Sequence, residues 1–317
     1  MPGSVTSLLS GAKEFLAALR NEGSLNLFVT VHGQFRARVT QVELHCMRLS
    51  AVEEQLSRIA FVAVPADLVL VTFPIGDRPA PISGGMRPEK GEFMTFGPGH
   101  RVHVRTQEPC HWGAIWFSAQ ELTGHLHRLT ECALTIPPSA QKWHPPLAAH
   151  RRLLRLHAAA IRAAEVRPET IVNAEAAHGM EQQLIEALVE CTLGGPLREE
   201  GHFRHRRQGI MAQLEDLLET QQDRHRRAEY FSIALGVSGR LLRMCCKDDL
   251  GMGLIRYIRL RALHRINRIL RGAPPGATSV SQVARCHGFH DLRCFAVNYR
   301  SLFGELPSAT LRRNLHW

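Results

Sequence analysis

The feature that most constrains the fold is a turn pattern that occurs twice in the last third of the chain. The first copy is SIALGVS, residues 232–238, and the second is ARCHGFHD, residues 284–291. In each copy a small residue lets two helices approach closely, and a glycine four residues later can end the first helix in the left-handed conformation. Ser238 and Asp291 then suit the N-cap of a second helix, because their side-chain oxygens can accept bonds from unpaired backbone N–H groups. Each copy therefore predicts a helix-turn-helix.

Apolar residues at helical spacing predict the helices around these turns. Between the copies, residues 254–271 form one long amphipathic pattern that ends at Gly272, with Pro274 just beyond. After the second turn, Phe295 and Tyr299 lie on the buried face of a helix that ends at a glycine. A long connecting helix would hold the two units at a fixed separation, as neighbouring segments of the DNA major groove require.

The surplus of positive charge lies entirely in the same region. Residues 201–317 carry 20 Lys and Arg against 9 Asp and Glu, a net charge of +11, whereas residues 1–200 carry 19 against 20. Of the 20 basic residues, Lys247 alone is a lysine. The guanidinium group bonds phosphates and guanine edges in bidentate fashion, so this composition favours a nucleic-acid partner. A GC-rich genome or an ordinary solvated basic face is the alternative explanation.

Residues 288–312, GFHDLRCFAVNYRSLFGELPSATLR, resemble the C-terminal signature of the AraC/XylS family of bacterial transcription regulators. The matching positions are Gly288, Phe289, Phe295, Tyr299, Arg300, Phe303, Gly304, Pro307 and Ser308. The first copy resembles the family at Gly236, Val237, Ser238, Leu242, Gly251 and Tyr257, and departs from it at Ser232, Cys246 and Leu254. The resemblance covers about residues 209–314 and implies two helix-turn-helix units, each with its second helix in the major groove.

The resemblance also implies which residues meet DNA. They are Ser238, Arg240, Arg243, Met244 and Lys247 in the first unit, and Asp291, Leu292, Arg293, Val297 and Arg300 in the second. Arginine can read guanine through O6 and N7, and an apolar side chain can meet a thymine methyl group. Lys247 and Arg300 are better placed for phosphate. For each arginine, a solvated surface charge is the alternative.

Short β-rich runs separated by Pro and Gly occupy residues 35–118. The predicted strands are Arg36–Arg48, Arg58–Val64, Leu68–Phe73, Phe93–Phe96, Arg101–Arg105 and Ala114–Phe117. This spacing predicts a small antiparallel barrel or jelly roll, and the family resemblance implies a cupin-like sensing domain in the same place. Two helices are expected after it, over 147–164 and 171–191. Their apolar stripes suit packing on the barrel or dimerisation, and we favour dimerisation.

The histidines of the barrel region do not form the ligand set of a metal-binding cupin. His100 and His103 match only the second half of that motif, and their opposite strand parity would point them to different faces. The sequence contains no nucleotide-binding or hydrolase fingerprint. We therefore expect no metal, no cofactor and no catalytic activity. A cupin-like metal enzyme with an accessory basic domain is the alternative.

The eight cysteines show no Cys-x-x-Cys pair and no zinc-finger spacing with histidine. Cys245 and Cys246 are adjacent on a predicted helix, where a disulfide would be strained, so packing is favoured over a redox role. No apolar stretch approaches the roughly 20 residues that span a bilayer, and the N-terminus lacks a signal-peptide pattern. We expect a cytoplasmic protein with reduced thiols and no membrane contact.

The sequence thus predicts an α+β protein of two domains. Residues 1–200 are a cupin-like antiparallel β-barrel with trailing helices for sensing and dimerisation, and residues 201–317 are an all-α domain of two helix-turn-helix units joined by a long helix. The predicted function is sequence-specific binding of promoter DNA as a transcription regulator that responds to a small-molecule effector. We expect a homodimer, with RNA polymerase as a further candidate partner. A regulator without an effector, controlled by its abundance or by a protein partner, is a third alternative.

Overall fold

Two antiparallel sheets enclose the apolar core of the N-terminal part. The computed structural model describes residues 2–19, 24–121, 124, 139–192, 201–220, 227–274 and 276–313. The larger sheet has the order β1 (Gly3–Leu9), β3 (Ala37–Glu43), β4 (Met47–Glu54), β10 (Cys110–Ser118), β6 (Leu68–Pro74), β8 (Phe93–Phe96) and β11 (Gln141–Trp143). The smaller sheet has the order β2 (Ser24–Val29), β5 (Arg58–Ala63), β9 (Arg101–Thr106) and β7 (Ile82–Ser83). The short helix α1 (Ala12–Leu19) closes the core with Phe15 and Leu19. Together they form a two-sheet version of the predicted antiparallel barrel.

Strand β10 shows why the centre of the larger sheet is a continuous apolar run. Successive side chains of a strand point to opposite faces. Trp112 and Trp116 join the core between the sheets, whereas Ile115 and Phe117 join a second core on the outer face. Both faces of this strand are therefore covered, and the strand has no polar side to present to water.

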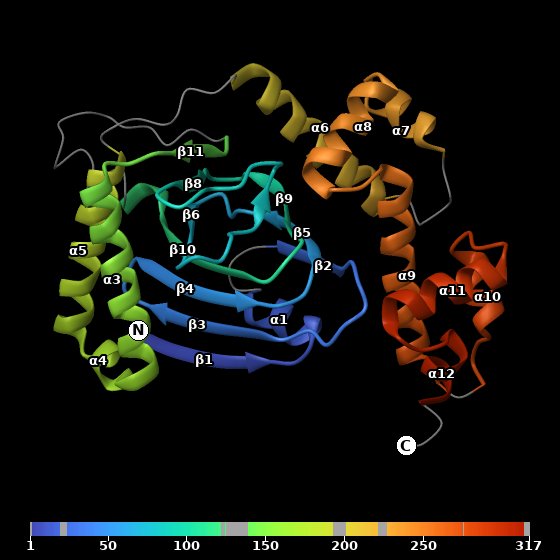
Figure 1. Cartoon of the computed structure of the whole chain (residues 1–317), viewed down its shortest axis with the longest axis horizontal. Helices are drawn as coiled ribbons and strands as arrows, with labels where there is room; N and C mark the ends of the chain where they lie inside the picture. Colours follow the sequence, from blue (N-terminus) through green and yellow to red (C-terminus); the bar gives the residue numbers. More distant parts are fainter. Residues whose placement is uncertain are drawn as a thin grey trace.

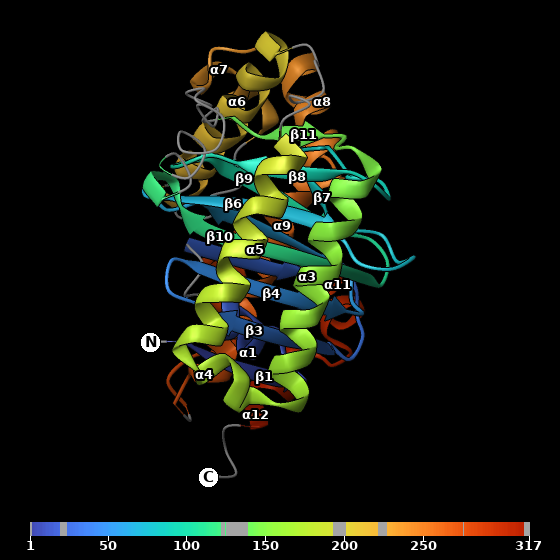
Figure 2. The ribbon, with the colours of Figure 1, turned by 90° about the vertical axis from the view of Figure 1, so that its left-hand side faces the viewer.

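Three helices cover the outer face of the larger sheet, as Figure 2 shows from that side. They are α3 (Leu147–Val166), α4 (Pro168–Val172) and α5 (Ala174–Thr192). Their apolar stripes, which include Leu153, Ala160, Leu184 and Leu188, are buried in the outer core together with strand residues. These side chains therefore pack against the sheet, which was one of the two roles predicted for them, and the dimer stays a prediction.

The remaining helices form a separate lobe beside the smaller sheet (Figure 1). They are α6 (Gly201–Thr220), α7 (Ala228–Ala234), α8 (Gly239–Leu250), α9 (Leu254–Gly272), α10 (Val280–Cys286), α11 (Leu292–Phe303) and α12 (Pro307–Arg312). The long helix α9 agrees with the predicted connecting helix, and its buried face carries Tyr257, Leu263 and Ile266. Within the described parts of the chain, no helix is long and apolar enough to cross a membrane.

The structure corrects several boundaries. The predicted strand Arg36–Arg48 is a hairpin, because the chain turns at 44–46 and the Leu44 amide donates to the Met47 carbonyl at 2.8 Å. The buried positions shift across the turn, from Val42 and Leu44 to Met47 and Leu49, and a single run of alternation does not allow for this shift. Strands β1, β2, β7 and β11, most of β4 and helix α1 were not predicted. Residues 201–207 form the first two turns of α6, ahead of the region that the family resemblance covers.

Candidate DNA-binding surface and its contact with the barrel

The first helix-turn-helix is formed by α7 and α8. Gly236 adopts a φ of 63° between them, which an L-residue with a side chain rarely takes. The Ser238 hydroxyl accepts the Leu241 amide at 3.2 Å and so caps α8. Gly251, with a φ of 69°, ends the helix in the left-handed conformation. Leu242 and the two adjacent cysteines of α8 are buried in the helical core.

The second unit, α10 and α11, repeats this geometry. Gly288 has a φ of 78°, and the Asp291 carboxylate accepts the amides of Arg293 and Cys294, each at 3.0 Å. Gly304 ends α11 with a φ of 75°. A carboxylate at a helix N-terminus also interacts favourably with the helix dipole. Both predicted turns and both predicted caps are therefore confirmed.

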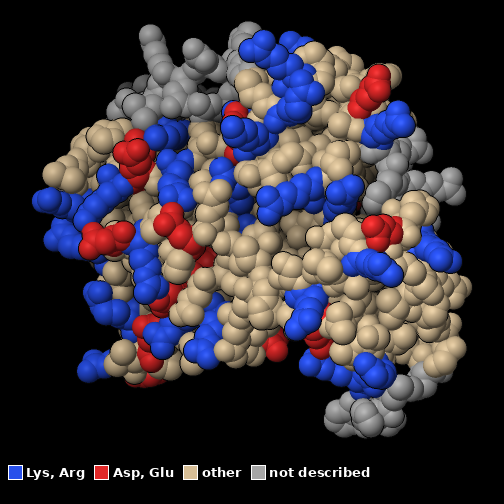
Figure 3. Space-filling view, turned by 45° about the vertical axis from the view of Figure 1, so that its right-hand side comes forward, with Lys and Arg blue, Asp and Glu red and all other residues tan. Residues whose placement is uncertain are grey.

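The predicted DNA-facing residues lie on the outer faces of α8 and α11. In the first unit, Ser238, Arg240, Arg243, Met244 and Lys247 are all exposed. In the second, Asp291, Arg293, Val297 and Arg300 are exposed, and the Val297 side chain is unusually open for an apolar residue at 68%. Leu292 differs, because it is half-buried and packs against the helical core. Figure 3 brings the side of the molecule with the helical lobe forward and shows Lys and Arg side chains spread over the lobe.

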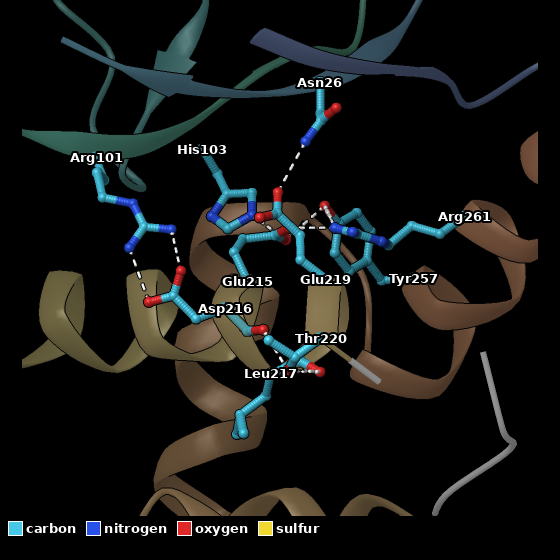
Figure 4. Close-up of polar contacts among 10 residues, drawn as sticks. All are labelled: Asn26, Arg101, His103, Glu215, Asp216, Leu217, Glu219, Thr220, Tyr257 and Arg261. Carbon is cyan, nitrogen blue, oxygen red and sulfur yellow. Dashed lines mark hydrogen bonds and ion pairs between the residues drawn. The ribbon is translucent and has the colours of Figure 1, made fainter. Parts of the chain in front are cut away.

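A buried polar cluster joins the helical lobe to the barrel (Figure 4). Glu215 of α6 is fully buried and accepts hydrogen bonds from His103 of β9 at 2.9 Å and from the Tyr257 hydroxyl at 2.8 Å. Arg261 of α9 donates to the other carboxylate oxygen. Burial opposes ionisation of Glu215, but the hydrogen bond and charge of His103 and the charge of Arg261 outweigh it and lower its pKa to about 2. The carboxylate is therefore the common acceptor for three donors from two lobes.

Apolar contacts surround this cluster. Phe28 of β2 and Ile59 of β5 belong to the same core as the α6 and α9 side chains. The Phe28 ring meets Tyr257 edge-on with centroids 6.1 Å apart, and the Arg261 guanidinium lies 5.3 Å from its centre. Because the core of the helical lobe includes strand residues, the two lobes share one buried interface.

Further polar contacts lie at the rim of the interface. Arg101 of β9 makes a two-pronged ion pair with Asp216, at 2.6 and 2.8 Å. Asn26 donates to Glu219 at 3.1 Å. Burial lowers the pKa of His264 of α9 to about 4, and its Nε2–H donates to the Val29 carbonyl at 2.8 Å. These contacts tie α6 and α9 to strands β2 and β9.

A second charged group lies where α8 meets the barrel. Arg207 of α6 donates to the Gly84 carbonyl and pairs with Asp248 at 3.3 Å. Asp249 is 2% exposed, and burial raises its pKa to about 6 although Arg207 lies 3.3 Å away. Arg105 of β9 donates to the Asp248 carbonyl at 3.4 Å. The C-terminal end of α8 is thus held against the barrel.

Sequence reasoning missed these interface residues, although a signal was present. Glu215 and Arg261 are charged residues at positions of their helices where the apolar stripe requires burial. Glu215 lies four residues after Met211, and Arg261 lies four residues after Tyr257. A charged residue at such a position must find a partner, because an unpaired buried charge is costly.

The barrel encloses a small cavity of about 60 Å³ on the opposite side of the same strands. Its wall is almost wholly apolar and includes Leu27, Ala60, Val62, Val102, Val104, Trp112, Ala114 and Trp116. Arg58 also lines it, but its guanidinium is paired with the buried Glu54 at 2.7 and 2.8 Å, and Trp112 donates to the same carboxylate. The buried indole N–H of Trp116 has no hydrogen-bond partner among the described residues.

Four side chains singled out in the sequence, two histidines and two cysteines, are all buried. His103 faces the helical lobe through Glu215, and His100 is buried with its ring 5.6 Å from that of Phe96. Cys245 and Cys246 are both buried, and burial raises the pKa of their thiols to about 11 and about 12. Protonated thiols inside a core agree with the packing role predicted for this pair.

Residues 231–313 match a family model described as a helix-turn-helix domain. This span begins within α7 and ends just after α12, so it contains both units and the helix between them. The fold and the match define a domain with two helix-turn-helix units. Several known proteins are also similar in sequence to part of this chain.

Two of these relatives are named as regulators. The XylDLEGF operon transcriptional activator of Pseudomonas putida is 47% identical over 57 residues, which are 18% of this chain and 18% of that protein. The probable thc operon regulatory protein of Rhodococcus erythropolis is 26% identical over 133 residues, 39% of this chain and 40% of that protein. The chain therefore matches less than half the length of both relatives.

Among solved structures, the AraC-like transcriptional activator CuxR is similar over 83% of this chain and 94% of that chain. The identity is 13% and the TM-score is 0.45.

Proposed function

We propose that this protein is a sequence-specific DNA-binding transcription regulator. The observation that carries the proposal is the pair of matched helix-turn-helix units, each of which exposes basic side chains on its second helix. The surplus of arginine in residues 201–317 supports it, because counterion release from phosphates drives binding to DNA. The names of the relatives support it as well.

The exposed side chains suggest a division of labour. Arg240, Arg243 and Arg293 would read guanine, whereas Met244 and Val297 would meet thymine methyl groups. Lys247 and Arg300, nearer the C-terminal ends of their helices, would hold phosphates. Ser238 and Asp291 use their side chains as caps and would set the start of each helix in the groove, and the half-buried Leu292 would reach DNA only through its exposed part.

Selection from a random duplex pool tests this function. The full-length protein is incubated with the pool at two salt concentrations, and bound duplexes are sequenced. Enrichment of two short boxes about one helical turn apart is the expected result. Salt-sensitive binding with no enriched sequence would leave only a basic nucleic-acid-binding module and would contradict the proposal.

The barrel would sense a small-molecule effector through strands β2, β5 and β9. Their inner faces line the cavity with Leu27, Ala60 and Val104, and their outer faces contact the helical lobe with Phe28 and His103. A ligand that displaces these strands would therefore act directly on the interface with α6, α8 and α9. The ligand would thus control whether the helical lobe stays in contact with the barrel, and no long chain of contacts would be needed.

The cavity wall would favour an uncharged, compact and largely apolar effector. The charge of Arg58 is already neutralised by Glu54, so a carboxylate ligand would meet a buried carboxylate. A hydrogen-bond acceptor on the ligand would satisfy the Trp116 N–H. Cyclohexanol and cyclohexanecarboxylate provide a matched pair of probes. Cyclohexanol is expected to raise the thermal midpoint, and a larger rise with the carboxylate would contradict this choice.

The protein would act as a homodimer, with RNA polymerase as a further partner at a promoter. Exposed apolar side chains lie on β1 and on the neighbouring helices, namely Val5, Leu8, Val166 and Val172, and β1 is the edge strand of its sheet. An unpaired edge with apolar neighbours is a common site of association. Sedimentation of the wild type and of a Leu8→Lys variant tests this surface, and a dimer that the variant leaves intact would exclude it.

A further inference from the structure

Three side chains with metal-binding donors meet outside the barrel, where the β3–β4 turn touches α5. His45 lies in the turn, and His178 and Glu181 lie on the helix. Their donor atoms are all within 4.8 Å of one another, and the two imidazole rings are 6.1 Å apart between centroids. The expectation of no metal rested on His100 and His103 and did not consider these residues, because the turn at 44–46 was not predicted.

Glu181 is the fixed member of this group. It is 2% exposed, and its Oε1 accepts the backbone amide of Cys46 at 2.7 Å. Its Oε2 lies 3.5 Å from Nδ1 of His45. The hydrogen bond from the Cys46 amide holds the turn against the helix and keeps His45 beside the carboxylate. Both histidines are exposed, so their rings can rotate without disturbing the core.

The spacing and the chemistry of the three donors suit one ion. Residues three apart on a helix lie on the same face, which places His178 next to Glu181. Two imidazoles and a carboxylate are a common ligand set for zinc and for neighbouring first-row ions. Donors about 2.0–2.2 Å from a tetrahedral ion are roughly 3.5 Å from each other. Rotation of the exposed rings would bring the present separations toward this value.

We propose that His45, His178 and Glu181 bind one divalent transition-metal ion, with Zn²⁺ as the expected occupant and water completing its coordination. The ion would tie α5 to the β3–β4 turn and so fix the outer helices on the larger sheet. Helix α5 lies on the outer face of the larger sheet, on the opposite side of the sheets from α8 and α11 (Figure 1). The presence or absence of the metal site is therefore independent of the function proposed above.

Titration with Co²⁺ tests the site in the full-length protein after treatment with a chelator. Saturable d–d absorption at one equivalent is expected, and Zn²⁺ should displace Co²⁺ and raise the thermal midpoint. His45→Ala and His178→Ala should each weaken Co²⁺ binding by at least about tenfold, since loss of even an indirect ligand partner costs that much. His290→Ala removes an exposed histidine before α11 and should change nothing.

Glu181→Gln separates metal binding from simple packing. The amide oxygen can still accept the Cys46 N–H, so the metal-free thermal midpoint should stay close to that of the wild type while Co²⁺ binding weakens. The proposal is overturned if the wild type shows no saturable Co²⁺ binding, or if both histidine variants bind Co²⁺ as tightly as the wild type.

Discussion

The two helix-turn-helix units have the same turns but different neighbours. In both, a glycine with positive φ ends the second helix, Gly251 in α8 and Gly304 in α11. The barrel residue next to Gly251 is Arg105, which lies beside buried charged groups of α6 and α8. The barrel residue next to Gly304 is His32, whose side chain is exposed. The first unit is thus built into the interface, whereas the second is attached through α9 and touches the barrel at its edge.

This difference indicates where the barrel can act on DNA binding. A change in strands β2, β5 or β9 reaches α6 and the end of α8 through buried contacts, so it acts on the first unit directly. It reaches α11 mainly through α9. We therefore expect regulation to appear as a change in the position of the first unit relative to the second.

The largest effect is expected for Glu215→Gln. The substitution leaves Arg261 buried without a charged partner, and loss of one member of a buried pair costs about 3–5 kcal/mol in the free energy of unfolding. Asp216→Asn is the matched control, because this neighbouring carboxylate pairs with Arg101 at the surface and is worth about 1 kcal/mol or less. Urea unfolding measures both variants.

Hydrogen exchange of the same variants tests the comparison between the units. Glu215→Gln should expose amides of α6, α8 and β9, whereas amides of α11 should keep most of their protection. Equal loss of protection in α8 and α11 would show that the second unit depends on the interface as much as the first.

Substitutions on the outer face of α8 should separate base reading from phosphate contact. Arg243→Ala is expected to cost roughly 1–3 kcal/mol at one position of the DNA site and to relax selectivity there. Lys247→Ala should weaken binding to all sequences alike and flatten the salt dependence. Binding to selected and random duplexes at several salt concentrations measures both. Equal losses on specific and random DNA for Arg243→Ala would remove it from the base-reading residues.

The raised pKa of Asp249 predicts a smaller, pH-dependent effect at the first unit. Burial raises this pKa from 3.8 to about 6. The charge of Asp248 also raises it, whereas the charges of Arg207, His103 and Arg105 lower it. Because the folded state binds this proton more tightly than the unfolded state, protonation of Asp249 stabilises the fold. This stabilisation is complete below pH 3.8 and is lost as the pH rises through 6. Between pH 5 and pH 8 this loss is about 1.4 kcal/mol.

Asp249→Asn should lack this part of the pH dependence, because its side chain does not titrate. Urea unfolding of both proteins at the two pH values gives the difference directly. Identical pH dependence of the wild type and the variant would contradict the assignment to Asp249.

The smallest effects are expected at the two N-caps. Ser238→Ala and Asp291→Ala each remove a cap and should cost about 1 kcal/mol. Asp291 accepts two amides and carries a charge at the helix N-terminus, so its loss should cost the more of the two. Thermal unfolding measures the order, and a larger loss for Ser238→Ala would contradict it.

The helix-turn-helix units were predictable because they depend on local chemistry. A positive φ requires glycine, and an N-cap requires a short polar side chain, so Gly236 and Asp291 could be identified without any knowledge of the rest of the fold. The interface was not predictable in the same way. One partner of Glu215 is His103, which lies 112 residues away, and no local pattern specifies such a pair.

The barrel shows the same limit. The alternation of apolar residues indicated strands, but the hairpin turn at 44–46 follows from the antiparallel pairing of β3 with β4. That turn carries His45, so the proposed metal site depends on tertiary structure that the sequence pattern did not reveal.

Duplex selection with wild type, Arg243→Ala and Arg293→Ala tests the central claim most directly. If α8 and α11 are paired reading helices, the wild type selects two boxes whose centres lie about 10 base pairs apart. Arg243→Ala then loses sequence information in one box and Arg293→Ala in the other. Loss in the same box for both variants, or selection of a single undivided site, would contradict two reading units in one domain.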